Sequence, residues 1–243
     1  MLKYQKGEHM KKFIVDKRLF EKIPNYCLGI VVAKGIDNKN TNDDIKKLLD
    51  KEIKDFADKY EESNIRELPH IKACRDAFQL LDMNPNKYMC SIESLTKRVQ
   101  KKKELPHINN IVDLSNAISI KYIFPLGAHD IDTLQGDMEL RFTTTEDTFT
   151  PLGEDVIETL SDNEVAYVSN HIVKTRRWLW RQSNDGKTTE KTTNVFFPID
   201  GFVEFKDEVL QARDELAKHL KELNAKTEVF YIDKDNNEII IEK

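Results

Sequence analysis

Within the central part of this chain, over about residues 41–199, the hydrophobic period changes near Asp130. Before that point, apolar residues recur at steps of three and four residues, which is typical of helices with one buried face. After it, short alternating or β-branched runs predict strands. The predicted helices are 41–60, capped at Thr41-Asn42, then 69–81, 91–103 and 109–122, and the predicted strands are 138–142, 165–168, 172–180 and 195–199. Helices and strands kept in separate stretches favour an α+β fold.

Further elements flank this central part. β-branched runs at 13–15 and 26–33 predict two early strands, and a helix with Val209, Leu216 and Leu220 on its inward face follows the last central strand. The runs 229–232 and 239–241, separated by a turn at 235–237, have the pattern of a β-hairpin. We therefore expect a single α+β domain over 10–243, with a mixed sheet and flanking helices.

The first nine residues are expected to be an extension that does not belong to the fold. Lys6-Gly7-Glu8 shortly before Met10 is what a purine-rich ribosome-binding site gives when it is translated, so Met10 is the expected start. A segment added for expression is the alternative.

Composition narrows the class of protein. With 39% hydrophobic and 33% charged residues, 243 residues suffice for a packed core. No apolar run approaches a membrane span, and the three cysteines lack metal-site or disulfide spacing, so we expect a reduced cytoplasmic protein with no membrane partner, no metal and no cofactor. The net charge of −5 disfavours indiscriminate nucleic-acid binding, and no DNA partner is expected. Nucleotide-loop, dinucleotide, zinc-peptidase and serine-hydrolase motifs are all absent from the sequence.

The first polar segment of interest is 106–132. Asp113 and Asn116 are three residues apart on a predicted helix, which places them on one face, as a candidate functional pair or as an ordinary solvent-facing pair. His129 stands next to Asp130 and two residues before Asp132, where it could act as a pH-sensitive base or belong to a network that anchors a loop.

Two further segments combine polar and aromatic residues. On a strand over 172–180, Arg176, Trp178 and Trp180 would share one face, and Arg177 and Arg181 the other, as base stacking and phosphate contact require. The alternative is that the arginines pair with acidic neighbours and that at least one tryptophan belongs to the core. Thr192 and Asn194, at the entrance of the next strand, could line a small polar pocket or form a turn.

These motifs together resemble the B3/B4 domain of the phenylalanyl-tRNA synthetase beta subunit, in its free-standing bacterial form. The resemblance lies in a VDxxN helix, a P-L-x-A-x-D-x-D turn and a later N-V strand, which are here residues 112–116, 125–132 and 194–197. It covers about 68–202 strongly and implies a B3/B4-type mixed sheet with flanking helices.

In the synthetase, the domain hydrolyses tyrosine wrongly attached to phenylalanine tRNA, with a histidine two residues after the proline and a glutamate three residues after the N-V pair. Gly127 and Pro198 stand at those positions here, which speaks against tyrosine as the substrate.

The resemblance implies a stand-alone domain that binds tRNA or aminoacyl-tRNA, takes the amino-acid moiety into a pocket and hydrolyses mischarged aminoacyl-tRNA. The alternative is a non-catalytic tRNA- or amino-acid-binding module. The candidate site residues are catalytic His129, Asn116 and Asp113; substrate-binding Pro125, Gly127, Thr192, Asn194 and Pro198; and RNA-binding Arg176, Arg177, Trp178, Trp180 and Arg181.

Overall fold

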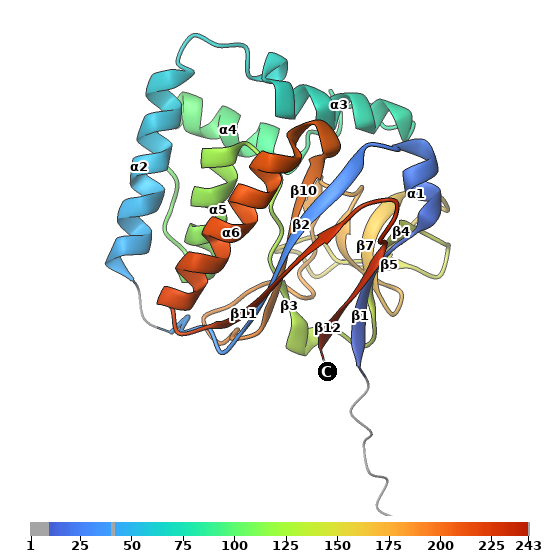
Figure 1. Cartoon of the computed structure of the whole chain (residues 1–243). Coiled ribbons are helices and arrows are strands. Elements are labelled where there is room, and N and C mark those ends of the chain that lie inside the picture. Colours follow the sequence, from blue (N-terminus) through green and yellow to red (C-terminus); the bar gives the residue numbers. More distant parts are fainter. Residues whose placement is uncertain (1–9, 40–41, 243) are drawn as a thin grey trace, which may run out of the picture.

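The computed structural model describes residues 10–39 and 42–242, which fold into two β-sheets and a layer of helices (Figure 1). The larger sheet has the order β12-β1-β4-β7-β8-β5-β6, with β9 paired to β8, and the smaller has the order β11-β2-β10-β3. The larger sheet comprises β1 (Lys11–Val15), β4 (Met138–Phe142), β5 (Thr148–Phe149), β6 (Glu158–Thr159), β7 (Val165–Ser169), β8 (Ile172–Arg176), β9 (Arg181–Gln182) and β12 (Glu238–Glu242). The smaller comprises β2 (Tyr26–Lys34), β3 (His129–Asp130), β10 (Val195–Phe202) and β11 (Lys226–Ile232). The predicted α+β fold with a mixed sheet is confirmed.

The helices lie around these two sheets. They are α1 (Lys17–Lys22), α2 (Asp43–Lys59), α3 (Pro69–Leu80), α4 (Ser91–Lys102), α5 (Asn110–Tyr122) and α6 (Lys206–Glu222), all close to the predicted ranges where a helix was predicted. Figure 1 shows α2, α4, α5 and α6 gathered on one side of the molecule, beside β2 and β10. Asn42 caps α2 through its side chain, as predicted, whereas Thr41 lies outside the described residues, as do residues 1–9.

The strand β10 is buried on both of its faces, and this positions the site. Val195, Phe197 and Ile199 pack with α5 and α6 in one hydrophobic cluster, while Phe196 and Phe202 pack in a second cluster with β1, β4 and β7. A strand buried on both faces reads as a nearly continuous apolar run. By the same alternation, Pro198 and Asp200 point toward the larger sheet.

Gly201 lets α6 lie close to β10. A Cβ at this position would stand 2.4 Å from Cγ2 of Val209 on α6, a distance that no real side chain tolerates. The glycine is therefore needed for the close packing of helix on sheet.

Two local predictions are wrong. The final strands do not form a hairpin, because β11 pairs with β2 in the smaller sheet and β12 pairs with β1 in the larger one. The chain still turns at 233–236, but each strand completes the edge of a different sheet, and local periodicity carries no information about which partner strand is available.

The predicted continuous strand over 172–180 is also interrupted. The strand β8 ends at Arg176, and Arg177 and Trp178 adopt left-handed backbone conformations with φ of 49° and 59°. These two positive φ values lie in the four-residue connection 177–180, after which β9 pairs back onto β8. The turn is strained for residues other than glycine, so the burial of Trp178 must hold it in place.

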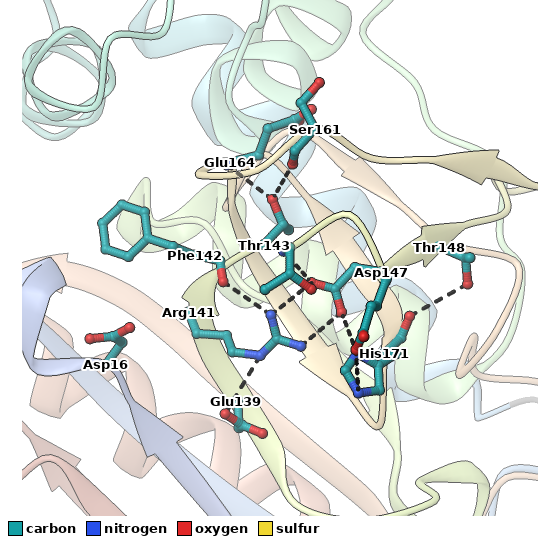
Figure 2. Close-up of polar contacts among 12 residues, drawn as sticks. Asp16, Glu139, Arg141, Phe142, Thr143, Asp147, Thr148, Ser161, Glu164 and His171 are labelled. Atoms are coloured by element: carbon teal, nitrogen blue, oxygen red, sulfur yellow. Dashed lines mark hydrogen bonds and ion pairs between the residues drawn. The ribbon is translucent and has the colours of Figure 1, made fainter.

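An ion pair joins β4 to the loop before β5 and to the turn between β7 and β8 (Figure 2). The guanidinium of Arg141 on β4 donates to both carboxylate oxygens of Asp147, at 2.7 and 2.8 Å, and Nδ1 of His171 lies 3.3 Å from the same carboxylate. The Thr144 N–H donates to Asp147 as well, at 2.8 Å. Burial works to raise the pKa of Asp147, but these hydrogen bonds outweigh it and hold the pKa below its ordinary value.

Candidate functional site

A cavity of about 170 Å³ lies between the two sheets and reaches α5. Four parts of the chain line it: Val112, Ser115 and Asn116 of α5; the segment 125–129; Pro198 and Asp200 of β10; and Tyr167, Thr175 and the segment 178–182 of the larger sheet. Ser91 and Thr188 complete the lining. Among the predicted site residues, the cavity therefore brings together Asn116, Pro125, Gly127, His129, Trp178, Trp180, Arg181 and Pro198.

The segment 125–129 forms one wall because it runs along β10. Leu126 and Ile199 form a single β-bridge, the Gly127 N–H donates to the Pro198 carbonyl at 2.9 Å, and the Asp200 N–H donates to the Pro125 carbonyl at 3.0 Å. Gly127 carries no side chain, and a Cβ there would lie 3.1 Å from both Nε2 of His129 and Cγ of Pro198. The absent side chain is thus what leaves room beside the histidine ring.

His129 is 2% exposed and is packed against aromatic rings. Its ring centroid lies 5.5 Å from that of Tyr167 and 6.2 Å from that of Phe196. Burial and the nearby ammonium of Lys174 lower its pKa to about 3, so the imidazole is neutral at physiological pH. Its Nδ1 has no hydrogen-bond partner among the described residues.

The two carboxylates next to His129 point elsewhere and anchor the turn. Asp130 accepts a hydrogen bond from the Thr192 hydroxyl at 2.6 Å, and Asp132 accepts two from the Asn194 amide at 2.9 and 3.0 Å. Asn194 also accepts from the Gly35 N–H at 3.1 Å. Thr192 and Asn194 thus lie outside the cavity lining and tie β3 to the start of β10.

Asp113 and Asn116 are separated by the structure. Asn116 lines the cavity, whereas Asp113 accepts hydrogen bonds from the Ile108 N–H at 2.9 Å and contacts Nδ1 of His107 at 2.8 Å. Asp113 therefore secures the loop that precedes α5 and is not brought to the cavity.

The three arginines of the predicted RNA-binding segment are in ion pairs. Arg176 contacts Glu158 at 2.6 Å and Glu164 at 2.9 Å, and Arg181 contacts Glu154 at 2.6 Å. Arg177 contacts Glu164 at 3.1 Å and lies over the Tyr88 ring at 3.9 Å from its centroid. Their charges are thus largely balanced within the protein.

The two tryptophans differ in their surroundings. Trp178 is 0% exposed and packs against Tyr26 and Phe78, so it belongs to the core and cannot offer its face to an external RNA base. Trp180 contacts Tyr88 edge to face and lines the cavity.

Sequence reasoning missed Asp200, which is 3% exposed and lines the cavity. Its Oδ1 accepts three hydrogen bonds: from Tyr26 Oη at 2.5 Å, Tyr167 Oη at 2.8 Å and Trp178 Nε1 at 2.9 Å. Burial raises its pKa to about 6, although these three donors act to lower it. The sequence signal for this residue is that it is the one acidic residue inside the apolar run of β10. An acidic residue is almost never fully buried unless it is paired.

Comparison with known families agrees with the motifs. The model of the B3/4 domain matches residues 73–223, more than half of the chain, so the chain belongs to the B3/4 domain family. The family predicted from the VDxxN, P-L-x-A-x-D-x-D and N-V motifs is thereby confirmed, and the match extends through α6, beyond the core predicted at about 68–202.

Among solved structures, the chain is similar to an N-terminal fragment of the phenylalanyl-tRNA synthetase beta-subunit from Pyrococcus horikoshii, with a TM-score of 0.47 and 14% identity. The alignment covers 93% of this chain and 53% of that fragment, so the chain spans about half of the fragment's length. No curated protein matches the sequence. Among the described residues, no helix is long and apolar enough to cross a membrane, and no group of three or more acidic, histidine or cysteine side chains is placed to hold a metal ion.

Proposed function

We propose that this cavity receives the aminoacyl group at the 3′ end of a tRNA and that the chain hydrolyses the ester that joins the two. The observation that carries the proposal is a small, mostly apolar cavity with a neutral histidine, an amide and a buried carboxylate, inside the part of the chain that matches the B3/4 family. Small-molecule sites have this combination of apolar walls and a few polar groups.

The size of the cavity supports an amino acid as its occupant. At about 170 Å³ it is comparable to an engineered protein cavity of about 150 Å³ that binds benzene. A space of this size takes an aminoacyl group with a small or medium side chain but not a nucleotide as well. The terminal adenosine and the rest of the tRNA would remain outside.

The reaction is an ester hydrolysis. The oxygen of a water molecule bonds to the ester carbonyl carbon, and the bond from that carbon to the ribose oxygen breaks. One proton of the water ends on the ribose oxygen, and the other leaves with the carboxyl group of the free amino acid or is released from it to solvent. An imidazole with a pKa of about 3 takes up a proton poorly at neutral pH, so we assign His129 the role of orienting the water through a hydrogen bond. We assign Asn116 to hold the carbonyl or amine of the substrate, and Pro125, Gly127 and Pro198 to form the wall.

Other predicted residues would hold the cavity walls in place or contact the tRNA outside the cavity. Asp113, Thr192 and Asn194 lie outside the cavity lining, and we propose that they hold α5, β3 and β10 in place around it. Trp180 and Arg181 line the cavity and are the members of the RNA-binding set best placed for the tRNA end. Arg176 and Arg177 would have to share or release Glu164 to contact phosphate. Affinity for tRNA should therefore depend only weakly on salt.

We also propose that residues 10–243 act as one domain in the cytoplasm. The strand β2, which precedes the predicted family core of 68–202, pairs along the whole of β10, and β11 pairs with the other edge of β2. A fragment restricted to 68–202 would leave one edge of β10 unpaired and would not be expected to fold.

A non-catalytic binding module is the second candidate. Gly127 and Pro198 occupy the positions where the resemblance places a histidine and a glutamate, and His129 is a weak base. Such a module would bind tRNA or an amino acid in the same cavity without turnover.

A panel of tRNAs charged with labelled amino acids separates the two candidates. With the wild-type protein, we expect loss of at least one ester above the uncatalysed rate, and we expect His129→Ala and Asn116→Ala to slow that loss roughly tenfold, as for a lost orienting hydrogen bond. The exposed variant Glu146→Gln serves as the control and should match wild type. Binding in a mobility shift without any release would favour the module, and neither binding nor release would refute both.

A further inference from the structure

The cavity contains a buried negative charge that lacks a cation. Asp200 is 3% exposed, and within the described part of the chain its carboxylate accepts hydrogen bonds from the hydroxyls of Tyr26 and Tyr167 and the indole of Trp178, which are all neutral. Of the described residues that line the cavity, Arg181 is the basic one, and its guanidinium is paired with Glu154 at 2.6 Å.

The three donors use one side of the carboxylate only. All three bond to Oδ1, so Oδ2 is the oxygen that they leave unengaged, on a residue that lines the cavity. A buried carboxylate is costly unless a positive charge or further donors accompany it. The arrangement is therefore complementary to a small cation that enters from the cavity.

We propose that the cavity binds a protonated primary amine and that Asp200 is its counter-charge. The inference rests on the proposed function for the identity of the natural ligand, which would be the α-ammonium group of the aminoacyl ester. An ammonium group has three N–H donors. Asp200 Oδ2 would take one, while Ser115, whose hydroxyl has no partner among the described residues, and Asn116 provide further acceptors in the same cavity.

This assignment restricts the expected substrates to esters whose acyl group carries a free amine. Acetylation of the α-amine removes its charge and adds a group that must fit beside the carboxylate. The site should therefore accept free aminoacyl groups and reject N-acylated ones. A hydrogen bond to a charged group is worth enough to change affinity by about tenfold or more.

Binding of an amine should also have a bell-shaped pH profile. The titratable or charged groups around Asp200 are Tyr26 on β2, Tyr167 on β7, Cys74 on α3, His129 on β3 and Arg181 on β9. Burial raises the pKa of both tyrosines, and a hydrogen bond between Cys74 and Cys90 together with burial raises the pKa of the Cys74 thiol. Burial lowers the pKa of His129 to about 3, so these four groups stay neutral between about pH 5 and 8. Affinity should rise as Asp200 ionises near pH 6 and fall as the amine of the ligand loses its proton near about pH 7.7–8.0.

The experiment uses the full chain and RNA-free ligands. L-alaninamide, L-valinamide and L-phenylalaninamide are each compared with the N-acetyl form, by thermal shift and by NMR titration across the same pH range. We expect wild type to prefer at least one free amine over its acetylated form by about tenfold or more, with the bell-shaped profile. Asp200→Asn keeps an oxygen for the three donors but removes the charge, and it should lose both the preference and the acidic limb.

The control variant is Tyr26→Phe. It removes one donor from Oδ1 without touching the cavity lining, so it should keep the preference for free amines while the acidic limb moves to higher pH, because that donor acts to lower the pKa of Asp200. The proposal is wrong if acetylated and free amides bind equally, if Asp200→Asn keeps the preference, or if Tyr26→Phe loses it together with Asp200→Asn, because the effect would then be structural. The wild-type pH profile alone decides the matter if Asp200→Asn does not fold.

Failure of this inference and failure of the proposed function give different results. Selective binding of free amines, with no aminoacyl-tRNA bound or hydrolysed, would leave the inference standing and refute the proposed function. Equal hydrolysis of aminoacyl-tRNA and N-acetyl-aminoacyl-tRNA would support the proposed function and refute this inference. Asp200 would then orient the attacking water or stabilise the fold.

Discussion

The substitution Asp200→Asn should change how the stability of the protein depends on pH. The pKa of Asp200 in the folded protein is raised from its ordinary value of 3.8 to about 6, because the carboxylate is buried between the two sheets. The unfolded chain therefore releases this proton at a lower pH than the folded one. A carboxyl group of this kind favours the folded state most at low pH, and the folded state loses stability as the pH rises through about 6.

The size of the effect follows from the shift. Two pKa units correspond to about 3 kcal/mol over the full titration. About 2 kcal/mol of this falls between roughly pH 4.5 and 7.5, since the unfolded carboxyl group is already mostly ionised at the lower limit. The asparagine variant has no such proton, while every other titration is common to the two proteins and cancels in the comparison.

Urea unfolding of both proteins at matched pH values measures the difference. The free energy of unfolding of wild type should fall by about 2 kcal/mol relative to Asp200→Asn between those limits. A difference that stays constant with pH would show that the burial of Asp200 does not perturb its titration. A difference that grows in favour of wild type as the pH rises would mean that the donors on Oδ1 outweigh burial, and the reasoning would be refuted.

Three other substitutions test separate parts of the structure. Asp147→Asn removes the charge that faces the partly buried Arg141 guanidinium, and it should lower the free energy of unfolding at neutral pH by about 1–3 kcal/mol. This loss should shrink as the pH falls below the ordinary carboxyl pKa of 3.8, because the pKa of Asp147 is lowered in the folded protein; no measurable loss at neutral pH would contradict the ion pair. Gly201→Ala should cost about 1–3 kcal/mol by the same measurement, because its Cβ would overlap Val209 on α6, and Val209→Ala should restore part of it; no loss, or no rescue, would argue against the close packing. Gly127→Ala places a methyl group in the cavity beside His129, so it should weaken the binding of amino acid amides in an NMR titration while the protein stays folded; unchanged affinity would place the ligand elsewhere.

Much of the fold could be predicted because local periodicity determines it. The apolar positions of α2 to α5, the Asn42 cap and the proline at the start of α3 are properties of short windows, and these helices appear within a few residues of their predicted bounds. The P-L-x-A-x-D-x-D and N-V motifs led to the correct family. They also predicted a turn, and Asp130 with Thr192 and Asp132 with Asn194 are the hydrogen-bonded pairs that anchor it.

The remaining features depend on contacts between distant parts of the chain. The strands β11 and β12 pair with β2 and β1, whose edges are open, and not with each other. A local sequence pattern carries no information about which edges are open. The segment 176–181 has strand-like residues, yet Trp178 turns into the core because Tyr26 and Asp200 are there to receive it.

The lining of the cavity also depends on contacts that local sequence patterns do not reveal. Alternation could place Asp200 on the face of β10 shared with Pro198, but only the fold shows that the two donors Tyr26 and Tyr167 come from separate strands to meet one carboxylate oxygen. Asp113 and Asn116 lie three residues apart but have different surroundings, because Asp113 is hydrogen-bonded to His107 and Ile108 in the loop before α5.

The central claim is that this cavity holds the aminoacyl end of a tRNA, and a structure of the protein with a stable mimic of that end tests it most directly. A suitable mimic is adenosine that carries an amino acid through a 3′-amide in place of the labile ester. The account predicts the amino acid portion inside the cavity, with its ammonium group against Asp200, its carbonyl on the side of His129 and Asn116, and the adenosine outside near Trp180 and Arg181. A mimic bound at another surface, or a cavity that stays empty while the mimic saturates the protein, would contradict it.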